Sequence, residues 1–332
     1  MRHSTPSVPA AQPSAKFPYL RVAVAVVAAS LGAVAAVNAI IAARVPQLGP
    51  RLGGQFDRYP ARYGDLAYVV GGSGSPLLLL HGLDAGRSMA EWRAVFEPLC
   101  ERHTVYAFDF QGYGMSDTTP EGYNAHDFAE QISNFISDVI GAKATVICAG
   151  ESAVPAILAA RDCPLVERIA LICPTAPDAP SPDSRAEALA LGSVATSVLN
   201  APIIGTAALN WWRSLAQLQK RARENGFYNK EEADREARLW HLTAHQKGAQ
   251  RVQKARLQDA FAHEWREVWE NIAAPALLMW GRNAMKQGFD SSPEWLALRP
   301  DTRLSVIEEA MLFPHLEQPQ HFCESVEKFV SG

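Results

Sequence analysis

The serine with the best sequence context for nucleophilic chemistry is Ser152. An apolar run of strand character, residues 144–148, leads into Gly150-Glu151-Ser152, and a helical pattern of small residues follows directly. A strand that turns sharply into a helix is the context of a nucleophile elbow, in which the serine hydroxyl projects above a parallel sheet. Such a turn requires small residues two positions before and after the serine, because strand and helix approach closely there. Gly150 meets this requirement, but Val154 stands where a second glycine is expected, so the sequence predicts an altered elbow.

Alternating strand and helix patterns predict the frame that would hold this serine. Continuous apolar runs are typical of strands buried on both faces of a parallel sheet, and helical patterns separate them along the chain. Besides 144–148, strands are expected at residues 66–70, 76–80, 104–109, 168–173, 275–280 and 303–307. This alternation predicts an α/β fold with a doubly wound, mostly parallel sheet.

A different pattern occupies residues 176–271, where amphipathic helices rich in Arg, Glu, Gln and Trp replace the strands. The strand rhythm resumes afterwards, so this stretch is interpreted as an insertion into the sheet domain. An insertion at this point would cover the carboxyl ends of the strands, where open α/β sheets bind ligands. The sequence therefore predicts a core of residues 66–175 and 272–332 with a helical cap of residues 176–271.

An apolar segment near the N-terminus, residues 22–43, is flanked by Arg21 and Arg44 and contains no charged residue. At about 1.5 Å per residue, a helix of this length crosses a hydrocarbon core of about 30 Å. A cleaved signal peptide is the alternative, because the segment is rich in alanine, but the apolar stretch is long for a signal sequence. We therefore predict a disordered tail at residues 1–18, a transmembrane anchor at 19–44 and a linker at 45–65.

Ala28, Gly32 and Ala36 form a row of small residues along this helix. Such a row allows a second helix to approach closely, so it suggests a membrane-protein complex as one possible partner. Basic residues are nearly balanced on the two sides of the segment, so the side of the membrane that holds the soluble domain stays open. Cys148 and Cys173 lie inside apolar strand runs, which favours reduced, buried thiols and a lean towards the cytoplasm.

The composition argues against several other functions. The net charge is −4, which gives no electrostatic footprint for nucleic acid. The five cysteines have neither a disulfide pattern nor metal-ligand spacing. Phosphate-binding loops, dinucleotide fingerprints and HExxH motifs are not found, so no cofactor and no metal are predicted.

Five motifs in the expected order resemble the α/β-hydrolase superfamily over roughly residues 60–330. They are L-L-L-L-H-G (77–82), D-F-Q-G-Y-G-M-S (109–116), G-E-S (150–152), A-L-L-M-W-G (276–281) and P-H-L-E-Q-P (314–319). The resemblance implies a lid-containing α/β-hydrolase fold in which Ser152 is the nucleophile. It also implies an oxyanion hole formed by the backbone amides of Leu83 and Ala153, and a structural hydrogen bond from His81.

The other two triad positions depart from the family pattern. The acid usually follows W-G by three residues, and Ala284 stands there. The histidine usually opens G-H-x-P-H-x-E-x-P, and Leu312 stands at its position. Together with the altered elbow, these departures indicate a triad that is lost or remodelled.

His315 is the candidate substitute base, because it follows the family position by about one helical turn. Glu308, Glu309 or Asp178 would have to orient it. Alternatively, His315 has a structural role and forms a hydrogen bond that holds the last loop against the sheet. Glu151, beside the serine, is expected to be hydrogen-bonded or solvated. A serine without a base is a weak nucleophile, and loss of the histidine alone lowers turnover by about 10⁶.

Three functions fit these residues. The chain is a pseudo-hydrolase whose pocket binds a small, mostly apolar ligand, or a scaffold subunit held in a membrane complex by its helix. The alternative is an ester or acyl hydrolase that uses Ser152 with His315 as a rearranged base. We predict a membrane-anchored pseudo-hydrolase.

Overall fold

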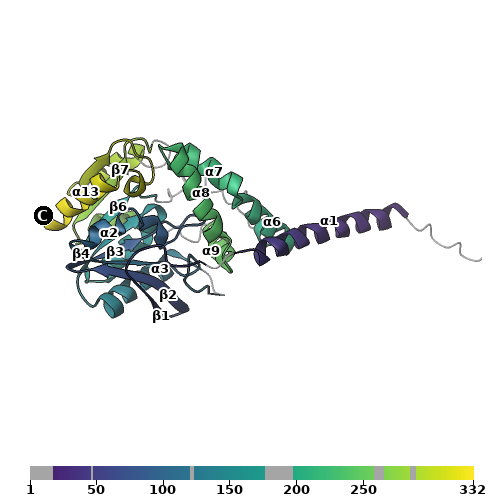
Figure 1. Ribbon diagram of the computed structural model, residues 1–332, viewed down its shortest axis with the longest axis horizontal. Helices are drawn as coiled ribbons and strands as arrows, with labels where there is room; N and C mark the ends of the chain where they lie inside the picture. The colour runs from purple at the N-terminus through teal and green to yellow at the C-terminus, as the bar shows by residue number, and fades with distance from the viewer. Residues whose placement is uncertain (1–17, 46–47, 120–122, 176–196, 258–264, 285–288) are drawn as a thin grey trace, which may run out of the picture.

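The computed structural model describes residues 18–45, 48–119, 123–175, 197–257, 265–284 and 289–332. Its centre is an eight-stranded sheet with the strand order β1-β2-β4-β3-β5-β6-β7-β8 (Figure 1). The strands are β1 (Gln55–Ala61), β2 (Gly64–Gly72), β3 (Ser75–Leu80), β4 (His103–Phe108), β5 (Ala144–Ala149), β6 (Val166–Ile172), β7 (Ala276–Gly281) and β8 (Arg303–Ile307). Strand β2 is antiparallel to β1 and β4, and all other neighbours are parallel.

Helices cover both faces of this sheet. On one face α3 (Ala125–Phe135), α4 (Ala153–Asp162), α10 (Trp265–Asn271) and α11 (Ser292–Leu298) contribute to one apolar cluster. On the other face α2 (Phe96–Cys100) and α13 (Pro319–Ser331) contribute to a second. In β3, Leu78 and Leu80 enter the first cluster, whereas Leu77 and Leu79 enter the second, which explains the unbroken apolar run. The predicted doubly wound, mostly parallel sheet is confirmed.

The first strand lies inside the stretch for which the sequence suggested a linker. Strand β1 pairs with β2 from Gln55 opposite Val70 to Ala61 opposite Gly64. Most side chains of β1 are exposed, because it forms one edge of the sheet. An exposed edge strand tolerates charged residues and Pro60, so it leaves no apolar alternation in the sequence. The structure therefore differs from the linker expectation at residues 55–61.

Helices of the described residues between β6 and α10 form what we call the helical insertion. They include α6 (Pro202–Trp212), α7 (Leu215–Arg221), α8 (Lys230–Ala244) and α9 (Ala249–Leu257). A third apolar cluster joins Phe227 and Trp240 of this region to Phe313 in the loop after β8. The insertion is thus packed against the sheet domain near the ends of its strands. Residues 176–196 and 258–264 of the predicted cap lie outside the described residues.

Helix α1 (Pro18–Ala43) extends away from the globular part of the chain (Figure 1). Its Val26–Ala43 window has a mean hydropathy of 2.2 and none of it is buried, so α1 is a candidate membrane span by length and composition. A signal sequence meets the same criteria. The row of small residues at positions 28, 32 and 36 is exposed. Residues 1–17 of the predicted tail (1–18) lie outside the described residues, and Pro18 begins α1.

Candidate functional site

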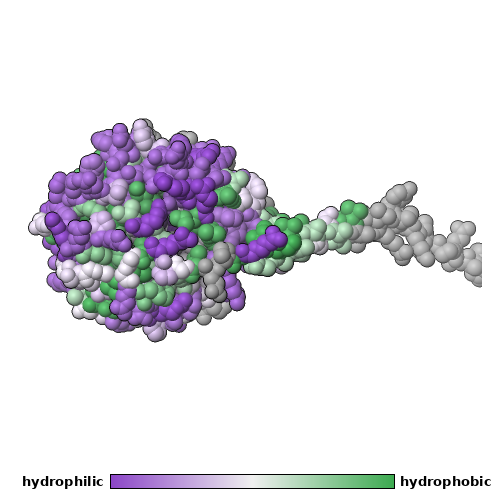
Figure 2. Space-filling model, viewed as in Figure 1, coloured by the Kyte–Doolittle hydropathy of each residue, from purple (hydrophilic) through white to green (hydrophobic). Residues whose placement is uncertain are grey.

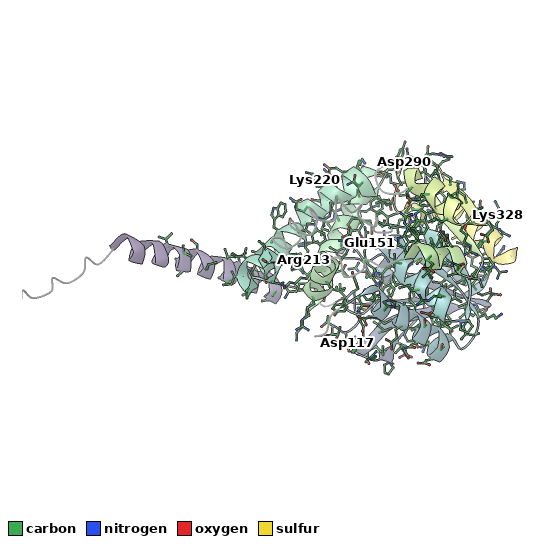
Figure 3. The ribbon with its side chains drawn as sticks, turned by 180° about the vertical axis from the view of Figure 1, so that it is seen from behind. Asp117, Glu151, Arg213, Lys220, Asp290 and Lys328 are labelled. Atoms are coloured by element: carbon green, nitrogen blue, oxygen red, sulfur yellow. The ribbon has the colours of Figure 1, made fainter. Side chains whose placement is uncertain are left out.

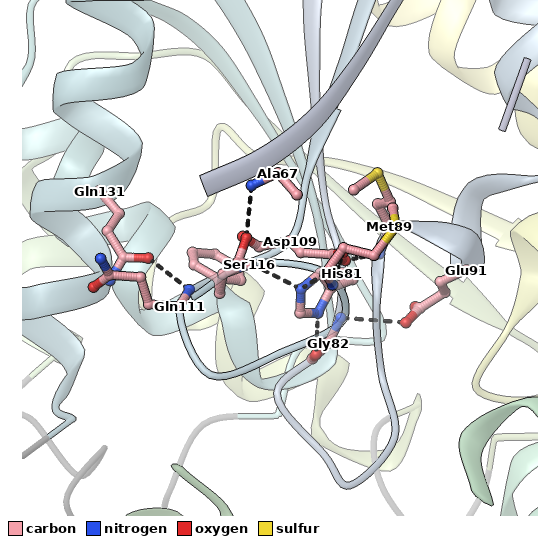
Figure 4. A network of polar contacts seen from close by, with 11 residues as sticks. Ala67, His81, Gly82, Met89, Glu91, Asp109, Gln111, Ser116 and Gln131 are labelled. Atoms are coloured by element: carbon pink, nitrogen blue, oxygen red, sulfur yellow. Dashed lines mark hydrogen bonds and ion pairs between the residues drawn. The ribbon is translucent and has the colours of Figure 1, made fainter. Parts of the chain in front are cut away.

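The loop after β3 is held by a buried histidine (Figure 4). His81 Nδ1 donates to Gly82 O over 2.6 Å, and its Nε2 accepts from Phe110 N over 3.1 Å. These two bonds require the neutral ring, in agreement with burial, which lowers the pKa of His81. His81 therefore has the structural role that the resemblance implies.

The loop after β4 is held by Asp109 in the same network (Figure 4). Its carboxylate accepts backbone hydrogen bonds from Met89 over 2.6 Å and Met115 over 2.8 Å. Burial raises the pKa of Asp109, although both amides oppose this change. Gly114 has φ 48°, and a Cβ there would lie 2.0 Å from Asp109 Oδ2, so only glycine fits. The D-F-Q-G-Y-G-M-S motif thus serves loop structure.

The turn after β5 presents Gly150, and not Ser152, to the cavity described below. Strand β5 ends at Ala149, and Gly150 follows with φ 57° in the left-handed region. Gly150 lines the cavity, and a Cβ built on it would meet no atom within 4 Å. Ser152 is fully buried, and its Oγ donates to Ala149 O over 2.8 Å. The serine hydroxyl is therefore directed to the end of the strand inside the turn.

The residues after Ser152 belong to the core. Ala153 and Val154 begin α4 and are buried in the first apolar cluster, so Val154 packs as a core residue. Of the predicted oxyanion pair, Leu83 lines the cavity and Ala153 does not. Glu151, the residue after Gly150, lines the cavity as well.

Glu151 joins the elbow to the helical insertion, and it lies between the sheet and those helices (Figure 3). Arg256 of α9 donates from Nε to Glu151 Oε2 over 2.6 Å and from Nη2 to Oε1. Its Nη1 lies 3.4 Å from Asp84 Oδ1. Burial alone would raise the pKa of Asp84, but Arg256 and Arg87 outweigh it, and the pKa is lowered. Asp84 therefore remains ionised in the site.

The structure pairs His315 with Glu91. The ring of His315 is fully buried and packs against Trp92, with ring centroids 4.5 Å apart and the ring planes tilted by 34°. Its Nε2 lies 3.4 Å from Glu91 Oε1, whereas Ser152 Oγ bonds to the backbone of β5. Burial lowers the pKa of His315, although Glu91 opposes this change. The structure therefore does not bring His315 and Ser152 together as a hydrogen-bonded couple.

The other candidate triad residues are dispersed. Glu308 is at the surface with Arg282 Nη2 3.0 Å from its Oε1, and Glu309 is exposed. Asp178 lies outside the described residues. Leu312 lines the cavity, whereas Ala284 is buried elsewhere and does not.

A cavity of about 130 Å³ lies between the elbow, the loop after β3 and the loop after β8. Its lining is strongly charged: Asp84, Arg87, Glu91, Glu151 and Arg256 all contribute, beside Leu83, Cys173, Leu312 and Phe313. The Arg87 guanidinium lies 3.9 Å from the ring centroid of Trp240 and 4.2 Å from that of Phe313. Arg87 Nη1 is buried and has no hydrogen-bond partner among the described residues, whereas Glu91 Oε1 faces His315 Nε2 at 3.4 Å.

Neither a metal centre nor a local motif marks this cavity. The described ranges contain no group of three or more His, Cys, Asp or Glu side chains that could hold a metal ion. Sequence reasoning missed Asp84, Glu91 and Arg256 as residues of the site. Glu91 meets His315, and Arg256 meets Glu151, only through the fold, so no spacing in the sequence could have found them.

The sheet, the elbow and the cavity at the strand ends define an α/β-hydrolase architecture. Residues 77–325, well over half of the chain, match the alpha/beta hydrolase family model. The chain therefore belongs to the α/β-hydrolase family.

The similar proteins include hydrolases. The soluble epoxide hydrolase of Corynebacterium sp. (strain C12) is 40% identical over 70 residues, which cover 21% of this chain and 24% of that protein. A membrane phospholipase A, described as a novel bacterial virulence factor, superposes with a TM-score of 0.63 at 23% identity, over 95% of this chain and 96% of its own. Cfl2 from Burkholderia cenocepacia gives a TM-score of 0.69 at 21% identity, over 85% of this chain and 98% of its own. At these identities the structures show the shared fold.

Proposed function

We propose that this chain is a membrane-anchored, non-catalytic member of the α/β-hydrolase family that binds a small polar ligand beside Gly150. The observation that carries this proposal is the turn after β5. A nucleophile elbow exposes its catalytic side chain at the sharp, strained residue between strand and helix. In this chain that residue is Gly150, which has open space where a side chain would project. Glycine has no group that can attack a substrate.

The residues on either side of Gly150 agree with its placement at the nucleophile position of the elbow. With Gly150 at the apex, Cys148 and Ser152 take the two positions that require small residues. The buried side chain of Ser152, bonded to Ala149 O, has the contacts expected of that packing role. The amide after the apex is then that of Glu151, which lines the cavity with Leu83. An oxyanion-type site without a nucleophile binds ligands and does not form an acyl-enzyme.

The remaining triad positions support the same proposal. Leu312 faces the cavity where the family histidine is expected, and Ala284 stands at the position of the acid. In a Ser-His-Asp system, loss of the nucleophile alone lowers turnover by about 10⁶, and binding with the oxyanion hole retains about 10³–10⁴ over water. With Gly150 at the nucleophile position, Leu312 at the base position and Ala284 at the acid position, this chain has no side chain that can perform any of the three catalytic roles.

The charged lining favours a polar ligand, in place of the apolar ligand expected from the sequence. A cavity of about 130 Å³ is large enough for several water molecules or for one small organic molecule. Arg87 Nη1 requires a hydrogen-bond acceptor, because buried polar atoms without partners are costly. The carboxylate of a short hydroxy acid or amino acid supplies such an acceptor.

The apolar α1 supports anchoring. Its Val26–Ala43 window is long enough to cross a membrane and is entirely unburied. The superposed protein that matches 95% of this chain is itself a membrane phospholipase A. The exposed row at Ala28, Gly32 and Ala36 leaves one side of α1 available to a second helix.

A fluorophosphonate probe tests the proposal, because it labels activated serines covalently. We expect no labelling of the full-length protein purified in detergent, and the same result for the Ser152→Ala variant. Labelling of the wild type that disappears in Ser152→Ala would overturn the proposal and favour a hydrolase that uses Ser152.

The ligand is tested by thermal shifts with lactate, glycolate and serine. A shift that is lost in Glu91→Gln but kept in the surface variant Glu308→Gln would support the assigned cavity.

A further inference from the structure

Helix α6 of the helical insertion has an apolar exposed face. Residues 197–212, which include α6, contain no acidic or basic residue, whereas α7, α8 and α9 are all charged. Ile204 is 52% exposed and Trp211 is 65% exposed. They are seven residues apart, which places them on the same side of an α-helix. An exposed apolar helix face in an otherwise charged region indicates a contact surface.

This face is continuous with the surface of α1. Asn38 Nδ2 of α1 donates to Ile203 O over 3.2 Å, and Asn210 Nδ2 of α6 donates to Asn38 Oδ1 over 2.9 Å. These bonds fix α6 against the C-terminal part of α1. Val37 and Ile40 of α1 are 54% and 50% exposed in the same region. Figure 2 shows the hydrophobic surface continuing from α1 onto the adjoining edge of the globular part.

The seam between α1 and the insertion has the polarity of a membrane surface. It contains a cavity of about 310 Å³. Ile40, Ile41 and Val45 at the end of the anchor and Leu242 of α8 give apolar walls, and Arg44, Asn210, Ser214, His241 and His245 give polar walls. Apolar and polar side chains therefore meet at this seam, as acyl chains and head groups do at a membrane surface.

The length of α6 decides how it would meet a bilayer. Its 11 residues extend about 16 Å, which is about half of a hydrocarbon core of about 30 Å. Such a helix lies in the interface and does not span it. Tryptophan is enriched at that depth, because its ring is apolar and its N–H is polar. Trp211 and Trp212 stand at the end of α6.

We infer that α6 lies in the surface layer of the phospholipid bilayer that α1 crosses. The apolar face with Ile204 and Trp211 contacts lipid, and the helical insertion is seated on the membrane beside the anchor. This inference rests on the proposed membrane anchoring by α1. It adds a second contact that holds the globular part in one orientation on the bilayer.

Photocrosslinking in proteoliposomes tests this surface. The photoreactive amino acid benzoylphenylalanine is placed, one site at a time, in the full-length chain at Ile204, Tyr228 or Val37. Tyr228 is the matched control, because it is 52% exposed like Ile204 but lies outside α1 and α6. Val37 reports on the anchor itself. The vesicles contain phosphatidylethanolamine and phosphatidylglycerol, and mass spectrometry detects lipid adducts.

We expect lipid adducts at positions 204 and 37 and none at 228. An adduct at 37 without one at 204 would overturn the inference and leave the anchor intact. Lack of an adduct at 37 would overturn the anchor as well. Crosslinking of position 204 to a second copy of the chain would show a protein interface in place of a lipid surface. Position 211 serves as the second site if the variant at 204 fails to fold.

Discussion

Two sets of loops at the same edge of the sheet differ in which residues of the family motifs they contain. The loops after β3 and β4 retain His81, Asp109 and Gly114, and every one of these residues has contacts that hold the backbone. The turn after β5 and the loop after β8 have Gly150 and Leu312 at positions that we assign to the nucleophile and the base. Residues that hold a loop are maintained by folding free energy, whereas catalytic residues contribute little to it. This difference is the one that the proposed non-catalytic role predicts, because only the residues that hold the backbone match the family motifs.

Two glycines with similar φ angles, Gly114 and Gly150, give the sharpest comparison of the two sets. Gly114→Ala should lower the free energy of unfolding by about 3–5 kcal/mol, because the new Cβ collides with Asp109 and the φ is unfavourable. Gly150→Ala should cost only about 1–2 kcal/mol, since only the φ is unfavourable and space is open. Urea unfolding in detergent measures both. Equal losses would contradict the assigned difference between the loops.

Removal of a network carboxylate should have the next largest effect. Asp109→Ala leaves the amides of Met89 and Met115 without their acceptor, so we expect a loss of about 2–4 kcal/mol. Glu308→Ala is the control, because this carboxylate is exposed in its ion pair with Arg282 and should change stability by less than about 1 kcal/mol. If Asp109→Ala lowered the free energy of unfolding by as little as Glu308→Ala does, Asp109 would not hold its loop any more than a surface carboxylate does.

The pH dependence of stability gives a smaller effect. The pKa of His315 is lowered by burial, so below pH 6.5 the unfolded chain binds a proton that the folded chain does not. The free energy of unfolding therefore decreases as the pH is lowered, by at most about 1.4 kcal/mol per pH unit for this group. Between pH 6.5 and 5, the slope should be less steep in His315→Gln and unchanged in His321→Gln, which alters an exposed histidine. Identical slopes in all three proteins would indicate a His315 that is charged in the folded state.

The sequence predicted the sheet because its signals are local. The apolar runs mark β3 to β8. Strand β1 was hidden, because its exposed side chains leave no pattern. The elbow was recognised, but the sequence favours Ser152 as its apex. Either Gly150 or Ser152 satisfies a strand–turn–helix pattern, and only the φ of 57° at Gly150 identifies the residue at the bend.

Contacts between distant residues could not be predicted from the sequence. The pairing of Glu91 with His315 depends on the packing of Trp92 against the loop after β8. The ion pairs of Arg256 with Glu151 and Asp84 depend on how the helical insertion docks. The contact between α1 and α6 likewise depends on Asn38 and Asn210, which no motif connects.

Thiol accessibility tests the central claim, that the elbow presents Gly150 and hides Ser152. Gly150→Cys and Ser152→Cys are treated separately with N-ethylmaleimide in the folded protein, and peptide mass spectrometry locates the modification. Cys148, which is fully buried in the neighbouring strand, reports any unfolding. We predict rapid modification at position 150 and protection at position 152, with both sites reacting in urea. Modification at position 152 with protection of position 150 and of Cys148 would contradict the account and return Ser152 to the cavity.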